Sequence, residues 1–207
     1  MTSRTDFSQT WLVEMPSGTG KLTGPGMFTS LQHSISDYVS HGMAPSILTN
    51  GFKKIIGQQV AFYWHEANGE IDLAVELSIA PQALIVNGVA TSPHGSTVHA
   101  SDLYGLIIND SNKPLKLMSD EQLSDDGLKL WKRLLQLGHT VSVYDSRNPT
   151  DLQKLYSPDD LDKFIQFHSA EHRRYQYVLS EAGAQSAEVK SCFNTYRMRK
   201  IAGLTTE

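Results

Sequence analysis

The sequence contains one cysteine, Cys192, among 207 residues. A single cysteine excludes an intramolecular disulfide and an all-cysteine zinc site, and it suits a reducing compartment. An excess of positive charge is also absent, because 18 lysines and arginines stand against 22 aspartates and glutamates, giving a formal net charge of −4. This balance argues against a protein dedicated to coating nucleic acid, so we do not expect a nucleic-acid partner.

Long apolar runs are missing as well. No stretch of the sequence approaches the roughly 20 apolar residues that a bilayer-spanning helix needs, and residues 1–6 carry no apolar signal region. No repeat of fixed period is visible. Hydrophobic residues nevertheless make up 40% of the chain, which is enough for a buried core. We therefore expect a soluble cytoplasmic protein without a membrane partner.

The chain divides into three parts by composition. Residues 1–50 are rich in Ser, Thr and Gly, with a strand-like piece at 10–15 and helical spacing of apolar residues from Phe28 to Val39. Residues 51–149 alternate between strand and helix patterns, and residues 150–207 have the pattern of two helices. We predict an α/β fold over residues 1–150, with a C-terminal helical extension, residues 151–207, packed on it.

The strands of the middle part have clear signals. Residues 60–65 and 71–77 alternate between apolar and polar positions, and Asn68-Gly69 between them predicts a hairpin turn, because both residues tolerate positive φ. Residues 83–90 are apolar on both faces, which indicates a central strand. Gly88 inside that strand predicts a β-bulge or a close backbone approach. Shorter strands are expected at 115–118 and 141–144.

Two helices are expected between these strands. One begins near Ser101, whose hydroxyl can cap it, and Asp102 complements the positive end of the helix dipole. The other opens at Ser119 or at Ser124, and Gly138 ends it. The resulting order of three strands, a helix, a strand, a helix and a strand predicts a mixed, mostly antiparallel sheet flanked by helices.

This order and its local residues resemble the GNAT superfamily of acetyl-CoA-dependent acyltransferases over residues 55–148. The similar features are the hairpin feeding a strand that ends at 88–92, the loop 93–100 running into a helix, and the helix 127–134 followed by Gly138. The resemblance implies a central strand that splays from its neighbour and hydrogen-bonds the pantetheine arm through its backbone. It also implies that the loop and helix N-terminus bind the CoA pyrophosphate. Residues 119–134 are similar to GNAT-like proteins of bacteriophages, which implies a phage origin.

The resemblance carries site residues with it. It implies acetyl-CoA binding by Val89, Ala90, Thr91, His94, Gly95, Ser96, Thr97, Val98, His99, Ala100 and Ser101. Glu76 is the carboxylate nearest to the central strand and is our candidate base, with His65 and His99 as alternatives. Tyr144, Tyr104 and Ser124 are the candidate acids, because Trp131 stands where the family commonly has a tyrosine, and an indole N–H cannot serve as that acid.

Two functions from different classes follow. The first is an N-acetyltransferase that uses acetyl-CoA to acetylate a small amine or a protein lysine. The second is a GNAT-fold binding module without catalysis, such as a phage protein that engages and modulates a host enzyme. The second is favoured by the missing tyrosine and by the loop 92–100, which departs from the family's Arg/Gln-x-x-Gly-x-Gly/Ala pattern. The C-terminal helices are expected to supply the partner surface or a homodimer contact.

Two further motifs are weighed and set aside. Residues 16–23 look like a phosphate-binding loop, but the required glycine and hydroxyl positions are Met15 and Leu22. Residues 168–172 match the His-x-x-Glu-His pattern of zinc hydrolases, which gives a third functional hypothesis. Its third ligand would be Glu181, Glu188 or Glu207. We expect a solvated helix face there and no metal, because Arg173-Arg174 would oppose a cation.

Overall fold

The computed structural model describes residues 25–81, 83–110, 116–120, 123–145, 147–164 and 175–180. Nine strands in these ranges form one sheet in the order β1-β2-β3-β4-β5-β6-β9-β7-β8. Their bounds are β1 Ser46–Ile47, β2 Phe52–Ile56, β3 Val60–Ala67, β4 Glu70–Ala80, β5 Ala83–Thr91, β6 Lys116–Met118, β7 Thr140–Asp145, β8 Asn148–Lys154 and β9 Tyr175–Ser180. All neighbours pair antiparallel except β5 and β6, which are parallel.

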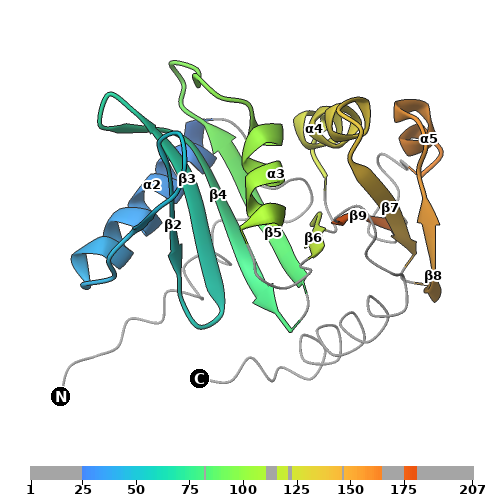
Figure 1. The fold of residues 1–207 in the computed structure, drawn as a ribbon, viewed down its shortest axis with the longest axis horizontal. Coiled ribbons are helices and arrows are strands. Elements are labelled where there is room, and N and C mark those ends of the chain that lie inside the picture. The colour runs from blue at the N-terminus through green and yellow to red at the C-terminus, as the bar shows by residue number, and fades with distance from the viewer. Residues whose placement is uncertain are drawn as a thin grey trace.

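Helices cover both faces of this sheet (Figure 1). Helix α2 (Pro25–Ser40) packs on one face, and α3 (Ala100–Asn109) and α4 (Asp125–Gln136) pack on the other, together with the short α5 (Pro158–Asp162). The structure therefore confirms the expected fold class, a mixed and mostly antiparallel sheet flanked by helices.

The two layers have separate hydrophobic cores. On one face, Met27, Leu31 and Ile35 of α2 contact the sheet cluster that contains Phe62 and Trp64. Their spacing of four residues places them on one side of the helix, as the sequence pattern predicted for residues 28–39. On the other face, a larger cluster joins α3 and α4 to the sheet; it includes Leu103, Tyr104, Ile107, Trp131 and Leu134.

The turn between β3 and β4 forms where the sequence predicted it. Ala67 pairs with Glu70 across the two residues Asn68 and Gly69, which adopt φ values of 55° and 82°. Two consecutive positive φ values match the right-handed twist of the flanking strands. The hairpin prediction is confirmed.

Strand β5 contains the irregularity that Gly88 predicted. Glu76 pairs with Gly88 and Leu77 pairs with Val86, so Asn87 is the extra residue of a β-bulge. The Asn87 side chain donates to Glu76 Oε1 (3.0 Å) and accepts from the Ser78 hydroxyl (3.0 Å). These contacts hold the bulge, which re-aims the second half of β5.

Strands β5 and β6 separate soon after they meet. Their register covers three pairs and ends at Ile85 and Met118. Ser119 then binds β9 in place of β5: its N–H donates to Tyr177 O (2.8 Å), and its hydroxyl accepts from Tyr177 N–H (2.9 Å). The side chain of Gln176 donates to the Ser119 carbonyl (2.9 Å). Because the chain follows β9, the edge of β5 beyond Ile85 diverges from it.

Helix α3 is fixed at both ends. At its start, Asp102 Oδ2 accepts from the N–H of His99 (3.1 Å). The helix begins at Ala100, one residue before the expected start at Ser101. At its end, Asp110 accepts from the Tyr63 hydroxyl (2.9 Å) and from the Lys54 ammonium (2.5 Å). Helix α4 begins after Ser124, whose Oγ accepts from Gly127 N–H (3.1 Å), which decides between the two expected starts.

The expectation of helices throughout residues 151–207 is wrong at residues 175–180. A helix does begin at Pro158, but it ends at Asp162, and Tyr175–Ser180 forms strand β9. The β-branched and aromatic residues of that segment fill the place between β6 and β7, where both of its edges find partners. Strands β1, β2 and β8 were also missed, and the expected boundary at residue 150 falls inside β8. Residues 10–15, 168–172 and 196–200 lie outside the described residues.

The first prediction tests what holds β6 to β9. Replacing Ser119, whose exposed fraction is 1%, by alanine leaves the buried Tyr177 N–H without its hydroxyl acceptor. We expect Ser119→Ala to lower the free energy of unfolding by about 1–3 kcal/mol. Urea denaturation measures this, with Ser36→Ala on the exposed side of α2 as the control, which should change it by no more than about 0.5 kcal/mol. Equal stabilities for both variants would contradict the role given to Ser119.

Candidate functional site

A pocket of about 230 Å³ lies where β5 and β6 diverge. One wall is the second half of β5, and the other is the segment after β6 with the first two turns of α4. The start of α3 and one residue of α2 complete it. The lining residues are Met27, Val86, Val89, Ala90, Thr91, Ala100, Tyr104, Ser119, Asp120, Leu123, Ser124, Asp126, Gly127, Leu130 and Trp131.

The pocket lining becomes more buried along β5, from the C-terminal end of the strand toward its middle. Thr91 is exposed, Ala90 and Val89 are half-buried, and Val86 is buried. The mouth therefore lies at the end of β5, beside the N-terminus of α3, and the deep end lies near the last β5–β6 pairs. A ligand entering here meets the strand edge that β6 has left.

Aromatic rings form the inner wall. Tyr104 and Trp131, each about 1% exposed, are in edge contact with ring centroids 6.0 Å apart. Trp131 also packs on Tyr177 of β9, with centroids 5.8 Å apart. Burial raises the pKa of the Tyr104 phenol, so it stays protonated at neutral pH. Tyr104 is thus a residue of the pocket lining whose ring is held in place by Trp131.

The charged side chains that line the pocket are both carboxylates, Asp120 and Asp126. Asp126 stands in the first turn of α4, where it complements the helix dipole, and Lys129 donates to it at 2.9 Å. No lysine or arginine is among the described residues that line the pocket. An anion bound at its mouth would therefore meet backbone N–H and hydroxyl groups among the described lining residues, and no lysine or arginine.

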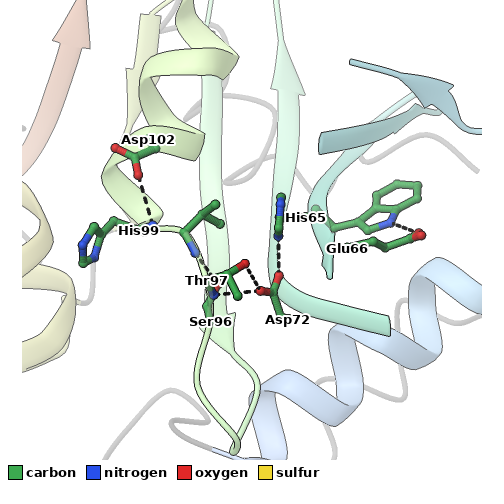
Figure 2. Close-up of polar contacts among 9 residues, drawn as sticks. His65, Glu66, Asp72, Ser96, Thr97, His99 and Asp102 are labelled. Carbon is green, nitrogen blue, oxygen red and sulfur yellow. Dashed lines mark hydrogen bonds and ion pairs between the residues drawn. The ribbon is translucent and has the colours of Figure 1, made fainter. Parts of the chain in front are cut away.

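The loop between β5 and α3 is anchored by a buried carboxylate (Figure 2). Asp72, 7% exposed, accepts from the N–H and the hydroxyl of Thr97 through Oδ2, both at 2.9 Å. Its Oδ1 lies 2.7 Å from His65 Nδ1, which must carry the proton because a carboxylate only accepts. Asp72 faces the loop because the β3–β4 register shifts between His65 and Glu66.

Hydrogen bonding keeps Asp72 ionised. Burial alone would raise the pKa of this carboxyl, but the hydrogen bonds from Thr97 and His65 outweigh burial and lower it below 3.8. The loop 92–99 is therefore anchored, through Thr97, by the ionised carboxylate of Asp72 in β4. Sequence reasoning missed this role, since Asp72 read only as the polar face of a strand.

The structure brings together some of the predicted cofactor residues. Val89, Ala90, Thr91 and Ala100 line the pocket. The other predicted residues lie in the adjoining loop or first helical turn and do not line it; they are His94, Gly95, Ser96, Thr97, Val98, His99 and Ser101. Ser101 is buried, and it lies inside α3 and not at the expected cap.

The candidate acids and bases are scattered. Ser124 lines the pocket, but its Oγ is engaged as the cap of α4. Glu76 lies outside the lining, half-buried in β4, and pairs in register with Gly88. Tyr144 is buried in a separate cluster with Ile85 and Met118. His65 is bound to Asp72 and packs edge-on against Phe52, with centroids 4.9 Å apart.

Metal and membrane features are not found in the described ranges. No group of three His, Cys, Asp or Glu side chains there is placed to hold a metal ion. The His-x-x-Glu-His pattern at 168–172, where we expect no metal, lies outside them. None of the described helices combines the length and the apolar character that crossing a bilayer requires.

Comparisons with known proteins give one structural likeness. No protein-family model and no curated protein sequence matches the chain. The fold is similar to that of a protein from Bacteroides thetaiotaomicron assigned to the GNAT family of acetyltransferases, with a TM-score of 0.38 and 8% identity. The match covers 87% of this chain and 96% of that one. A likeness of this degree carries no argument about activity, which must come from the pocket.

The second prediction concerns the anchor of the loop. Asp72→Ala leaves the buried donors of His65 and Thr97 without an acceptor, and we expect a loss of about 2–4 kcal/mol in the free energy of unfolding at pH 7. The exposed Glu70→Ala is the control and should change it by less than about 0.5 kcal/mol.

The difference in free energy of unfolding between wild type and Asp72→Ala should depend on pH. Because folding lowers the pKa of Asp72, its stabilisation is complete above the ordinary value of 3.8 and is lost as the pH falls through the lower folded value. The difference between wild type and Asp72→Ala should therefore narrow below about pH 4 in urea titrations. A difference that stays constant down to about pH 2 would show that the Asp72 charge is not the stabilising group.

Proposed function

We propose that the protein binds acetyl-CoA in the pocket between β5 and α4 and transfers the acetyl group to an amine, on a small molecule or a protein lysine, in the cytoplasm. The observation that carries this proposal is the divergence of β5 from β6 after three residue pairs, with a pocket at the released strand edge. The resemblance noted in the sequence implies that arrangement for a pantetheine arm.

The size of the pocket limits which part of the donor it encloses. Sites that enclose a whole drug-sized ligand measure roughly 300–1,000 Å³, and this one has about 230 Å³. In our proposal the thioester and the adjoining arm lie inside, along β5. The nucleotide lies outside, with its pyrophosphate near the loop 92–99 and the N-terminus of α3, where helix N–H groups and the dipole favour an anion.

The reaction needs few groups. The amine nitrogen attacks the thioester carbonyl, the C–N bond forms, the C–S bond breaks, and CoA leaves as a thiolate. The developing oxyanion would be stabilised by N–H groups of the released β5 edge. Glu76, beside the bulge and opposite Gly88, is our candidate to take the proton of the ammonium, through water. His65 is held by Asp72 and serves the loop.

Tyr104 is our candidate acid in place of Tyr144 and Ser124. Tyr104 lines the pocket, whereas Ser124 is engaged as the cap of α4 and Tyr144 is buried in a separate cluster. The raised pKa of Tyr104 keeps the phenol protonated at neutral pH, so its hydroxyl stays a hydrogen-bond donor. Tyr104 would donate a hydrogen bond, and then its proton, to the sulfur.

The third prediction tests donor binding. Ala100, half-buried at the pocket mouth, becomes a carboxylate in Ala100→Glu and should repel the donor phosphates. Calorimetric titration with acetyl-CoA and CoA should give saturable binding to wild type, weakened at least about tenfold in this variant. The control, Gln136→Glu at the exposed far end of α4, adds the same charge and should bind as wild type does. No binding to wild type at millimolar ligand would refute the proposal.

The fourth prediction tests the acid. Tyr104→Phe keeps the ring that packs on Trp131 and removes the hydroxyl. In an acetylation assay with an amine panel, kcat should fall about 10²–10⁴-fold, because that is the usual contribution of a positioned proton donor. The Kd for acetyl-CoA should be unchanged. A variant with wild-type kcat would remove Tyr104 from the mechanism.

A second candidate function is a binding module that keeps the fold without transfer. Two observations favour it: the position of the expected tyrosine holds the buried Trp131, and the charged pocket lining is acidic. In this case the partner would be a protein, such as a host enzyme if the chain comes from a phage. Absence of acetyl-CoA binding, or binding without turnover on any amine, favours the module over the enzyme.

A further inference from the structure

The floor of the pocket comes from the opposite layer of the fold. Met27 belongs to α2, on the face of the sheet away from α3 and α4, and it packs in the α2 core with Leu31 and Ile35. It is nevertheless the one α2 residue among the described lining of the pocket. A side chain can reach across the sheet in this way only where neighbouring strands have separated, as β5 and β6 have.

Glycine at position 88 makes room for this side chain. A Cβ atom on Gly88 would lie 2.8 Å from the Met27 sulfur and 3.1 Å from its terminal methyl carbon, both too close. The thioether therefore rests on the bare backbone of β5, next to the bulge at Asn87. Met27 is 8% exposed, so the space is filled.

The acyl end of a bound donor would meet this floor. The phosphates belong at the mouth, beside Thr91 and Ala100, so the thioester points along β5 toward the buried Val86. Gly88 stands between these two ends of the pocket, and Met27 covers it. The terminal carbons of an acyl chain longer than acetyl would run into the Met27 side chain.

We propose that Met27 determines the acyl-chain length of the donor, restricting the pocket to short chains. This rests on the proposed function, since it specifies the donor of the same site. Met27→Ala removes three heavy atoms and opens room for about three methylene groups. Each methylene that becomes buried should strengthen binding about fourfold, from the free energy of burying a CH₂ group.

The test is calorimetric titration of the full chain with acetyl-, butyryl- and hexanoyl-CoA. Wild type should bind acetyl-CoA at least as tightly as hexanoyl-CoA, and Met27→Ala should shift the ratio of the two affinities at least about tenfold toward hexanoyl-CoA. The control is Leu31→Ala, a truncation of another buried α2 side chain, one turn along the helix and outside the described lining, which should leave the ratio unchanged. Should Met27→Ala fail to fold, Met27→Val shortens the same side chain and should shift the ratio in the same direction.

The outcomes separate the two proposals. Donor binding by the variants with an unchanged ratio overturns the role of Met27 and leaves acetyl-CoA binding intact. An equal shift in Leu31→Ala also overturns it, because loosened α2 packing would then be the cause. Wild type that binds none of the three donors overturns the proposed function and this inference together.

Discussion

Backbone polar groups along a strand edge need partners, and the edge of β5 loses its partner strand β6 beyond Ile85. Up to that residue β6 supplies the hydrogen bonds, and beyond it the chain after β6 is bound to β9 through Ser119. The pocket of the candidate site depends on this separation. It creates the pocket inside the sheet, aligns the pocket with a strand edge, and lets residues from both helical layers reach it.

The site is rigid because each wall belongs to a packed core. Tyr104 and Trp131 are part of the larger cluster, and Met27 is part of the α2 cluster. The loop at the mouth is fixed by hydrogen bonds from Thr97 to the ionised Asp72 of β4. Such an arrangement positions neutral groups well, but it places carboxylates and no described cation along the lining. If acetyl-CoA binds there as we propose, its binding energy would come from contacts of the pantetheine arm with the β5 edge more than from contacts of its phosphates.

Local signals predicted much of the fold. The turn at Asn68-Gly69, the bulge beside Gly88 and the helix start at Ser124 each follow from a few neighbouring residues. Strand β9 was missed because its conformation depends on two partner strands distant in sequence. The same reason limited the site: Ala90 and Ala100 followed from a motif, whereas Met27 enters the pocket only through the packing of a distant helix.

The resemblance implies a tyrosine where this chain has Trp131, and the residues that Trp131 contacts bear on the proposed chemistry. In the transfer that we propose, a positioned proton donor beside the departing sulfur can come from any helix that reaches the pocket. Here Tyr104 of α3 reaches the same pocket, and the indole of Trp131 packs against it and against Tyr177. Trp131 thus stands where the resemblance implies the acid, and it packs against the ring of Tyr104, our candidate donor. The substitution that favours a non-catalytic module is equally consistent with a proton donor moved from one helix to the next.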